Sequence, residues 1–319
     1  MARHPLTAVP ATRSSLPLLQ IRRRLVLGFL ALAVVSGLFS TVAWIASGND
    51  QPPTVEIPDQ SAVSLAQTVV EDFLAARRSS VPAVEDVTSD FSAPNASGEP
   101  AAPLAVESLT FAGSTQSPPI GDQQNRPAVK PVLEKFHATI AGKLYAITVP
   151  MVRSGSEWLL AAAPSITPER VAANETKPGI DYEQLYPSKE ALDANSLPAA
   201  YRTQIKTWAD TFARAGRADP ALYRLVDNES AHTYSGLGGW TLVTEPQLKS
   251  AVPVSSPHPG YVVRVGLVLR ASATNGPTLS TEYDLYLRSD KSQSQPPVVA
   301  WGAVGSYWSL APYFNADQR

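Results

Sequence analysis

Residues 132–152, VLEKFHATIAGKLYAITVPMV, decide the fold class of this 319-residue chain. In both runs, Val132–Ile140 and Leu144–Val152, apolar side chains alternate along the chain, which is typical of β-strands that bury one face. The short segment Ala141-Gly142-Lys143 between them indicates a turn. A third strand is predicted over Trp158–Ala163, so this part of the chain predicts an antiparallel sheet.

A helix is predicted before these strands. Apolar side chains recur at helical spacing between residues 66 and 74, and Phe73 is the largest of them. Ser64, followed three residues later by Gln67, matches a capping box and predicts the helix start. Arg77 and Arg78 follow at the predicted C-terminal end, where positive charges interact favourably with the helix dipole. A helix followed by an antiparallel sheet is an α+β pattern.

The same order of elements begins again near residue 198. A helix is predicted through Trp208 and Phe212, and Asp219-Pro220 predicts the start of a short second helix. The two helical stretches align, with VVEDFLAARR at 69–78 against WADTFARAGR at 208–217. The predicted strands of the two halves follow in matching order: Val106–Phe111 and the three above, then Trp240–Thr244, Tyr261–Ala271, Glu282–Arg288 and Val298–Val304. We interpret this order as a tandem duplication of one α+β domain.

An uncharged apolar segment of 22 residues, Leu25–Ala46, precedes both halves. As a helix it would be about 33 Å long, enough to cross a hydrocarbon core of about 30 Å. Five arginines and no acidic residue precede it, and the first acid is Asp50. The excess of basic residues predicts a cytoplasmic N-terminus and an extracytoplasmic location for residues 47–319. Cleavage as a signal peptide near Thr41-Val42-Ala43 stays an alternative.

Three small residues, Ala33, Gly37 and Thr41, fall four apart within this segment. On a helix they would share one face, where a second helix could approach closely. They are therefore a candidate contact between membrane helices, although small residues are also common in such helices for no specific reason.

Composition excludes several functional classes. Residues 47–319 hold 21 of the 26 Lys+Arg and all 28 Asp+Glu, a net charge of −7, which argues against a nucleic-acid surface. The chain has no cysteine, which excludes disulfides, a thiolate nucleophile and cysteine-bound zinc.

Candidates for catalysis are weak. Asp227, Glu229, Ser230 and His232 cluster before the glycine-rich run 235–239, but neighbours in sequence rarely meet in the geometry of a nucleophile and its base. We interpret that cluster as a helix end and an exposed loop. The glycine run lacks the lysine and the strand–loop–helix context of a phosphate-binding loop.

Metal and cofactor sites are not expected either. The four histidines, His4, His137, His232 and His258, have no spacing that suits a metal. Charged residues of the strand 282–288 alternate with apolar ones, which predicts a half-solvated strand. Phe73, Trp208 and Phe212 are predicted to be core residues. We therefore expect no catalytic residue, cofactor or metal.

The chain is thus predicted to contain seven parts. They are a basic tail (1–24), a transmembrane helix (25–46), a spacer (47–60), a first α+β domain (61–166), a linker (167–197), a second α+β domain (198–308) and a loose tail (309–319).

A long helix, a short helix and a curved antiparallel sheet resemble the cone-shaped fold of nuclear transport factor 2. A basic tail, one membrane helix and two such domains resemble the TcpC family of conjugative-transfer proteins from Gram-positive plasmids and integrative elements. That family is similar in turn to the bitopic VirB-type assembly subunit of type IV secretion. The resemblance covers nearly the whole chain and is carried by its architecture and by helix stretches such as Gln67–Arg78.

The resemblance implies a non-catalytic scaffold subunit of a DNA-transfer channel, anchored in the cell membrane of a bacterium. It implies self-association and contacts with a coupling ATPase and a cell-wall hydrolase, without direct binding of nucleic acid. Two alternatives stay open: an accessory membrane protein of an actinobacterial-type lipid importer, and a cone domain that binds a small ligand in an open apolar pocket.

Overall fold

The computed structural model describes residues 59–85, 87–92, 104–116, 131–169, 196–223, 225–226, 233–254, 259–271, 277–289, 295–306 and 315–317. The predicted membrane helix, with Ala33, Gly37 and Thr41, lies outside these ranges, as does most of the predicted linker. Among the helices within them, none is both long and apolar enough to span a bilayer.

The fold is α+β with two antiparallel sheets, which confirms the predicted class. The first half consists of α2 (Gln60–Leu74), β1 (Val106–Gln116), β2 (Val132–Ile140), β3 (Lys143–Ser154), β4 (Glu157–Leu160) and β5 (Ser165–Pro168). The second half consists of α4 (Ala199–Arg214), α5 (Pro220–Tyr223), β6 (Thr233–Tyr234), β7 (Trp240–Leu242), β8 (Gln247–Val254), β9 (Gly260–Ala271), β10 (Thr278–Arg288), β11 (Val298–Ala303) and β12 (Ala316–Asp317).

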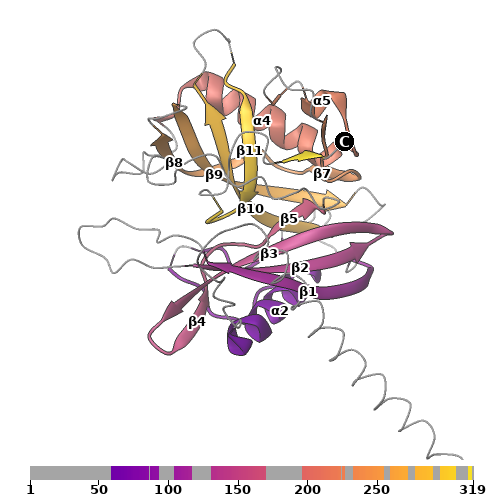
Figure 1. The fold of residues 1–319 in the computed structure, drawn as a ribbon, viewed down its shortest axis with the longest axis vertical. Coiled ribbons are helices and arrows are strands. Elements are labelled where there is room, and N and C mark those ends of the chain that lie inside the picture. The colour runs from indigo at the N-terminus through magenta and orange to yellow at the C-terminus, as the bar shows by residue number, and fades with distance from the viewer. Residues whose placement is uncertain are drawn as a thin grey trace, which may run out of the picture. The chain divides into compact units, whose positions relative to one another are not determined.

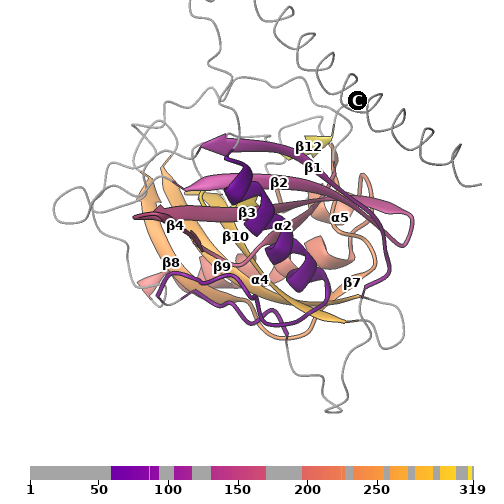
Figure 2. The ribbon, with the colours of Figure 1, turned by 90° about the horizontal axis from the view of Figure 1, so that it is seen from below.

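In the first sheet the strands follow the order β1-β2-β3-β4, and β5 pairs with the same edge of β3 as β4. Helix α2 lies across one face of this sheet (Figures 1 and 2). The face it covers carries Phe136, Ile147 and Val149, which are all buried, as is Phe73 on the helix. Burial of this apolar face is the main force that holds helix and sheet together.

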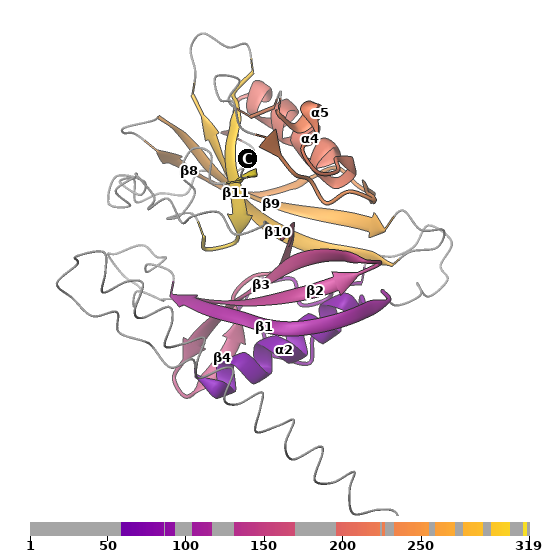
Figure 3. The same cartoon turned by 45° about the vertical axis from the view of Figure 1, so that its right-hand side comes forward.

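The second sheet repeats this order of connections. Strands β7 and β8 pair with consecutive parts of β9, β9 pairs with β10, and β10 pairs with β11. In each half, therefore, an edge element leads into two long paired strands and a shorter last strand. The single strand β1 of the first half corresponds to the two strands β7 and β8 of the second. Helices α4 and α5 lie on one side of the second sheet (Figure 3).

Helix α2 begins and ends differently from the prediction. Its N-cap is Asp59, whose carboxylate accepts a hydrogen bond from the backbone N–H of Ser61 at 2.9 Å, so the helix starts about one turn before the predicted capping box. The predicted capping residue Gln67 instead donates to Glu71 at 3.1 Å. Arg77 lies beyond the helix end and turns back to Asp72 at 2.6 Å. The interaction of Arg77 is therefore with one buried carboxylate rather than with the helix dipole.

Two strands of the large sheets, β5 and β8, were not predicted, and neither was the short pair β6 and β12. Strand β5 extends from the end of the predicted first domain into the predicted linker, and it pairs with β3 from Tyr145↔Pro168 to Thr148↔Ser165. Strand β8 pairs with seven residues of β9. The sequence places prolines within or beside both strands, at Pro168 and Pro253, and these hid their β character.

The C-terminal residues are held in place, whereas the sequence predicted a loose tail over 309–319. Strand β12 pairs with β6. Ser235 donates to the carboxylate of Asp317 at 2.8 Å. Asn315 is buried and bonds both backbone groups of Trp301, at 2.7 and 2.8 Å. Residues 315–317 are therefore part of the second half.

Residues Pro58–Arg319 form one compact unit, and a single hydrophobic core extends through both halves. Phe73, Trp208 and Phe212 are all fully buried, which confirms their prediction as core residues.

Candidate functional site

The glycine-rich run 235–239 contacts side chains of the first half. Gly236, Leu237 and Gly238 are buried. A Cβ on Gly236 would come within 2.4 Å of the carbonyl oxygen of Phe212 and 2.7 Å of that of Ala215, so only glycine fits this close approach to the end of α4. Of the acidic cluster before the run, Asp227, Glu229, Ser230 and His232 lie outside the described residues, as does His258.

Side chains of β3 bond directly to this run. Lys143 donates to the carbonyl of Gly238 at 2.7 Å, and Tyr145 donates to that of Leu237 at 3.1 Å. Trp240 packs edge-on against Tyr145, with ring centroids 6.4 Å apart, and its indole N–H lies 3.4 Å from the tyrosine hydroxyl. Backbone carbonyl groups of the glycine run therefore accept the hydrogen bonds that connect the second half to strand β3.

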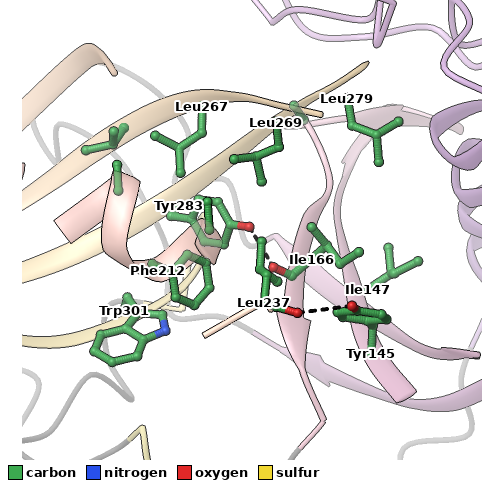
Figure 4. Close-up of a cluster of buried hydrophobic side chains, with 14 of the residues drawn as sticks. Tyr145, Ile147, Ile166, Phe212, Leu237, Leu267, Leu269, Leu279, Tyr283 and Trp301 are labelled. Atoms are coloured by element: carbon green, nitrogen blue, oxygen red, sulfur yellow. Dashed lines mark hydrogen bonds between the residues drawn. The ribbon is translucent and has the colours of Figure 1, made fainter. Parts of the chain in front are cut away.

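A second set of bonds joins β10 to the strand β5 and to Pro164 just before it, and Figure 4 shows the bond between Tyr283 and Ile166. Tyr283 donates to the carbonyl of Ile166 at 2.6 Å, and Thr281 donates to that of Pro164 at 2.8 Å. Both side chains are buried, and burial raises the pKa of Tyr283 well above its usual range. The tyrosine is therefore a permanent hydrogen-bond donor at ordinary pH and is unsuited to act as a base. We call these two sets of bonds the seam.

The interior of the second half is filled by its own aromatic side chains. Trp208 and Phe212 of α4 stack with centroids 4.9 Å apart, and both contact Tyr283 and Trp301. Tyr234 completes the group at 6.0 Å from Trp301. Aromatic side chains of α4, β6, β10 and β11 thus pack together in the interior of the second half.

His137 lies on the outer face of the first sheet, opposite the helix. Its Nε2 atom is 3.2 Å from a carboxylate oxygen of Glu169, and Lys135 approaches the same carboxylate at 3.3 Å. Neither the Nε2 atom of His137 nor this oxygen of Glu169 makes a hydrogen bond of good geometry with a described residue, so the interpretation of His137 as a satisfied residue stays a prediction. Sequence reasoning did not identify Glu169, which follows the unpredicted strand β5. In the described ranges, no group of three or more acidic or histidine residues could hold a metal ion.

Glu134 is a buried acidic residue in the sheet of the first half. It shares the helix-facing side of β2 with Phe136 and Ala138, and it is fully buried. Neither of its carboxylate oxygens accepts a hydrogen bond of good geometry. Burial raises the pKa of Glu134 above its usual value of 4.5, Ser114 on β1 lowers it in part, and the charge of Asp59 raises it. The sequence did contain a signal, because Glu134 interrupts an otherwise apolar row.

The Glu134→Gln variant is expected to be more stable than the natural protein by about 1–2 kcal/mol at neutral pH, since a buried unpaired carboxylate is replaced by a neutral amide. A raised folded-state pKa adds stability below pH 4.5, and this contribution is lost as the pH rises through the folded-state value. Urea unfolding from pH 4 to 8 should therefore show a decline that the variant lacks. The exposed residue Glu157 provides the control. If Glu134→Gln and Glu157→Gln behave alike, the interpretation is wrong.

Strand β10 is buried on both faces, which corrects the prediction of a half-solvated strand. The outward-facing side chains Glu282 and Asp284 are only 8% and 3% exposed. Arg264 on β9 lies 3.3 Å from Asp284, and Lys249 on β8 lies 3.9 Å from Glu282. Burial raises the pKa of both carboxyl groups, and these cations oppose the shift. Cross-strand ion pairs thus replace the solvent that the alternating pattern indicated.

Strand β1 is the exposed element of the first sheet. Nine of its 11 residues are exposed, including Val106 at 36% and Phe111 at 40%. It pairs with β2 along one side only, and Phe111 leans on Phe136 at 5.5 Å. An exposed strand with apolar side chains is typical of a surface that binds another chain.

Comparison with known proteins adds no identification, since neither a protein-family model nor a curated protein matches this chain. Within the described ranges, the arrangement comprises two sheets joined by hydrogen bonds, a second half with an interior of packed aromatic side chains, and the exposed strand β1. Among the described residues, the candidate functional surface is therefore β1.

Proposed function

We propose that this protein is a non-catalytic, membrane-anchored scaffold subunit of a conjugative, type IV secretion-like DNA-transfer apparatus. In this proposal the apolar segment 25–46 spans the cell membrane, and the two halves lie outside as cone-shaped domains related to nuclear transport factor 2. The protein would act by self-association and by binding other transfer proteins, such as a coupling ATPase and a cell-wall hydrolase.

The observation that carries the proposal is the repeated helix-and-sheet arrangement behind an apolar anchor segment, with side chains that fill the second half. The two sheets share one order of connections, as a duplicated domain would. Trp208, Phe212 and Trp301 pack against one another in the interior of the second half. An interior filled in this way favours a scaffold over a cone that binds a small ligand.

Deletion of the gene in a donor cell is expected to reduce DNA transfer to a recipient by at least about a hundredfold, because a missing channel subunit stops assembly rather than slowing one step. The measurement is a mating assay, with the natural gene supplied in trans as the restoring control. A third strain should carry the two halves on an unrelated membrane anchor. Restored transfer there would assign residues 25–46 to location alone.

Normal transfer in the clean deletion would contradict the proposal. A lipid-uptake operon beside the gene, together with lost lipid import in the deletion strain, would support the importer alternative instead.

A further inference from the structure

The outer strands of a sheet carry unpaired backbone N–H and C=O groups that can pair with another chain. The two large sheets described for this protein have two edges each. On the first sheet these edges are β1 on one side and β4 with β5 on the other. On the second they are β11 on one side and β7 with β8 on the other. The four edges differ sharply in how they are protected.

The β4/β5 edge is covered by the protein itself. The backbone of Leu160 in β4 accepts from Val84 and donates to Pro82, both at 2.9 Å. The carbonyl of Ile166 in β5 accepts the seam hydrogen bond of Tyr283. Both ends of this edge therefore have partners.

The β11 edge is capped by a side chain. The amide of Asn315 accepts from the backbone N–H of Trp301 and donates to its carbonyl, at 2.7 and 2.8 Å. A side-chain amide that makes both bonds takes the place of a neighbouring strand.

The β7/β8 edge carries the residues that natural sheets use against unwanted pairing. It is interrupted at residues 243–246, which include Pro246, and β8 contains Lys249 and Pro253. Lysine and proline at an edge disfavour the addition of a strand. This edge corresponds to β1 in the repeated order of strands, so it is an internal reference for β1.

Strand β1, VESLTFAGSTQ, has none of these protections. It contains no lysine, arginine or proline. Its one charged residue, Glu107, is exposed, and its carboxylate accepts from the backbone N–H of Gly142 in the β2–β3 turn at 2.8 Å. Irregularities in the pairing with β2 flank a regularly paired stretch, Ser108–Phe111. No described strand pairs with the outer side of this uncharged stretch.

We propose that β1 pairs with β1 of a second copy of this chain, antiparallel and related by a two-fold axis through Thr110. In this register Leu109 of each copy lies opposite Phe111 of the other, on the face where both are partly or largely exposed. Glu107 lies opposite Gly113, so no like charges face each other across the axis. The strand is thus complementary to itself, as an isologous contact requires, with apolar pairs on one face and a threonine pair on the other.

This inference deepens the proposed function, because self-association is part of that function, but its test is physical and independent of DNA transfer. The chain has no natural cysteine, so a single introduced thiol reports one position. Across the axis, two Thr110→Cys side chains would be direct neighbours. Mild oxidation of the full-length Thr110→Cys protein in detergent micelles or membranes is expected to give a disulfide-linked dimer in most molecules. The control variant Thr244→Cys, at the exposed position that aligns with Thr110, should give little disulfide-linked dimer.

Charge reversal tests the same contact without a new bond. Thr110→Lys places two ammonium groups opposite each other and is expected to weaken self-association of the full chain at least about tenfold in sedimentation equilibrium. Thr110→Glu should do the same, and an equimolar mixture of the two differently tagged variants should form the mixed dimer.

Three results would overturn the inference: a monomeric natural protein, equal cross-linking at Thr110 and Thr244, or self-association that Thr110→Lys leaves unchanged. Residues 25–46 are present in every variant, so any association through them is common to all. A Thr110 dimer in a protein whose deletion leaves transfer normal would uphold this contact and reject the proposed function.

Discussion

Replacing Trp208 with alanine is expected to lower the free energy of unfolding by about 3–5 kcal/mol, the cost of removing a large aromatic side chain from a closed core. Trp208 is fully buried, stacks on Phe212 and contacts Tyr283 and Trp301. Its indole N–H has no hydrogen-bond partner within the described residues. Trp208→Phe should therefore lower the free energy of unfolding by less than half as much, because this substitution changes the packing but breaks no hydrogen bond.

Urea unfolding followed by circular dichroism measures both losses. Thr207→Ala, at the exposed neighbouring position, is the control and should change stability by no more than about 0.5 kcal/mol. Hydrogen exchange adds a second result. Because one core and one seam join the halves, Trp208→Ala should raise exchange in β2 and β3 along with that in β9 and β10. A loss below about 1 kcal/mol, or a first half that keeps its protection, would contradict the shared core.

Replacing Arg264 with methionine is expected to cost about 3–5 kcal/mol, because it leaves Asp284 as a buried carboxylate without its cation. The side chain of Asp284 keeps one bond, from the backbone N–H of Gly305 at 2.8 Å. Lys249 lies near Glu282 and is already engaged there. The remaining partners therefore cannot compensate the lost charge.

The pH dependence of this variant has a definite sign. Burial already raises the pKa of Asp284, and loss of Arg264 should raise it further. Arg264→Met should thus be closest to the natural protein at acidic pH, where Asp284 is protonated, and fall behind as the pH rises. The double variant Arg264→Met/Asp284→Asn should recover more than half of the loss in thermal unfolding. An equal loss at every pH and no recovery would exclude the ion pair as the cause.

Local sequence patterns predicted the long strands well. Apolar side chains along 132–140 and 144–152 alternate clearly, and the observed strands β2 and β3 differ from these ranges by at most two residues. Helix α4 was equally clear from the spacing of its buried residues. Each of these elements buries one face. A single buried face makes apolar residues recur at a regular spacing, which can be recognised in the sequence without knowing which element packs against that face.

The errors occurred where a distant segment decides the environment. Alternating charge in Glu282 and Asp284 indicated solvent, but Arg264 and Lys249, on strands that only the fold brings close, cover those positions. The short strand β5 depends on its pairing with β3. Ser64 and Gln67 matched a capping motif, but Asp59 was available one turn earlier. Local propensity yields to tertiary contacts in each case.

The candidate surface was predictable only in part. The sequence indicated a strand at 106–111, and the observed strand β1 continues to Gln116. Its place at the end of the sheet follows from strand order, which no local pattern contains. The hydrogen bond of Glu107 likewise depends on the position of Gly142, 35 residues away.

The seam also has a consequence for how the connection between the halves can vary. Carbonyl groups of Ile166, Leu237 and Gly238, held by Tyr283, Tyr145 and Lys143, fix the contact between the two sheets. None of these three bonds, all between described residues, involves the chain between residues 170 and 195. We therefore expect these bonds to keep the register of the two sheets when a small reporter is inserted between residues 170 and 195.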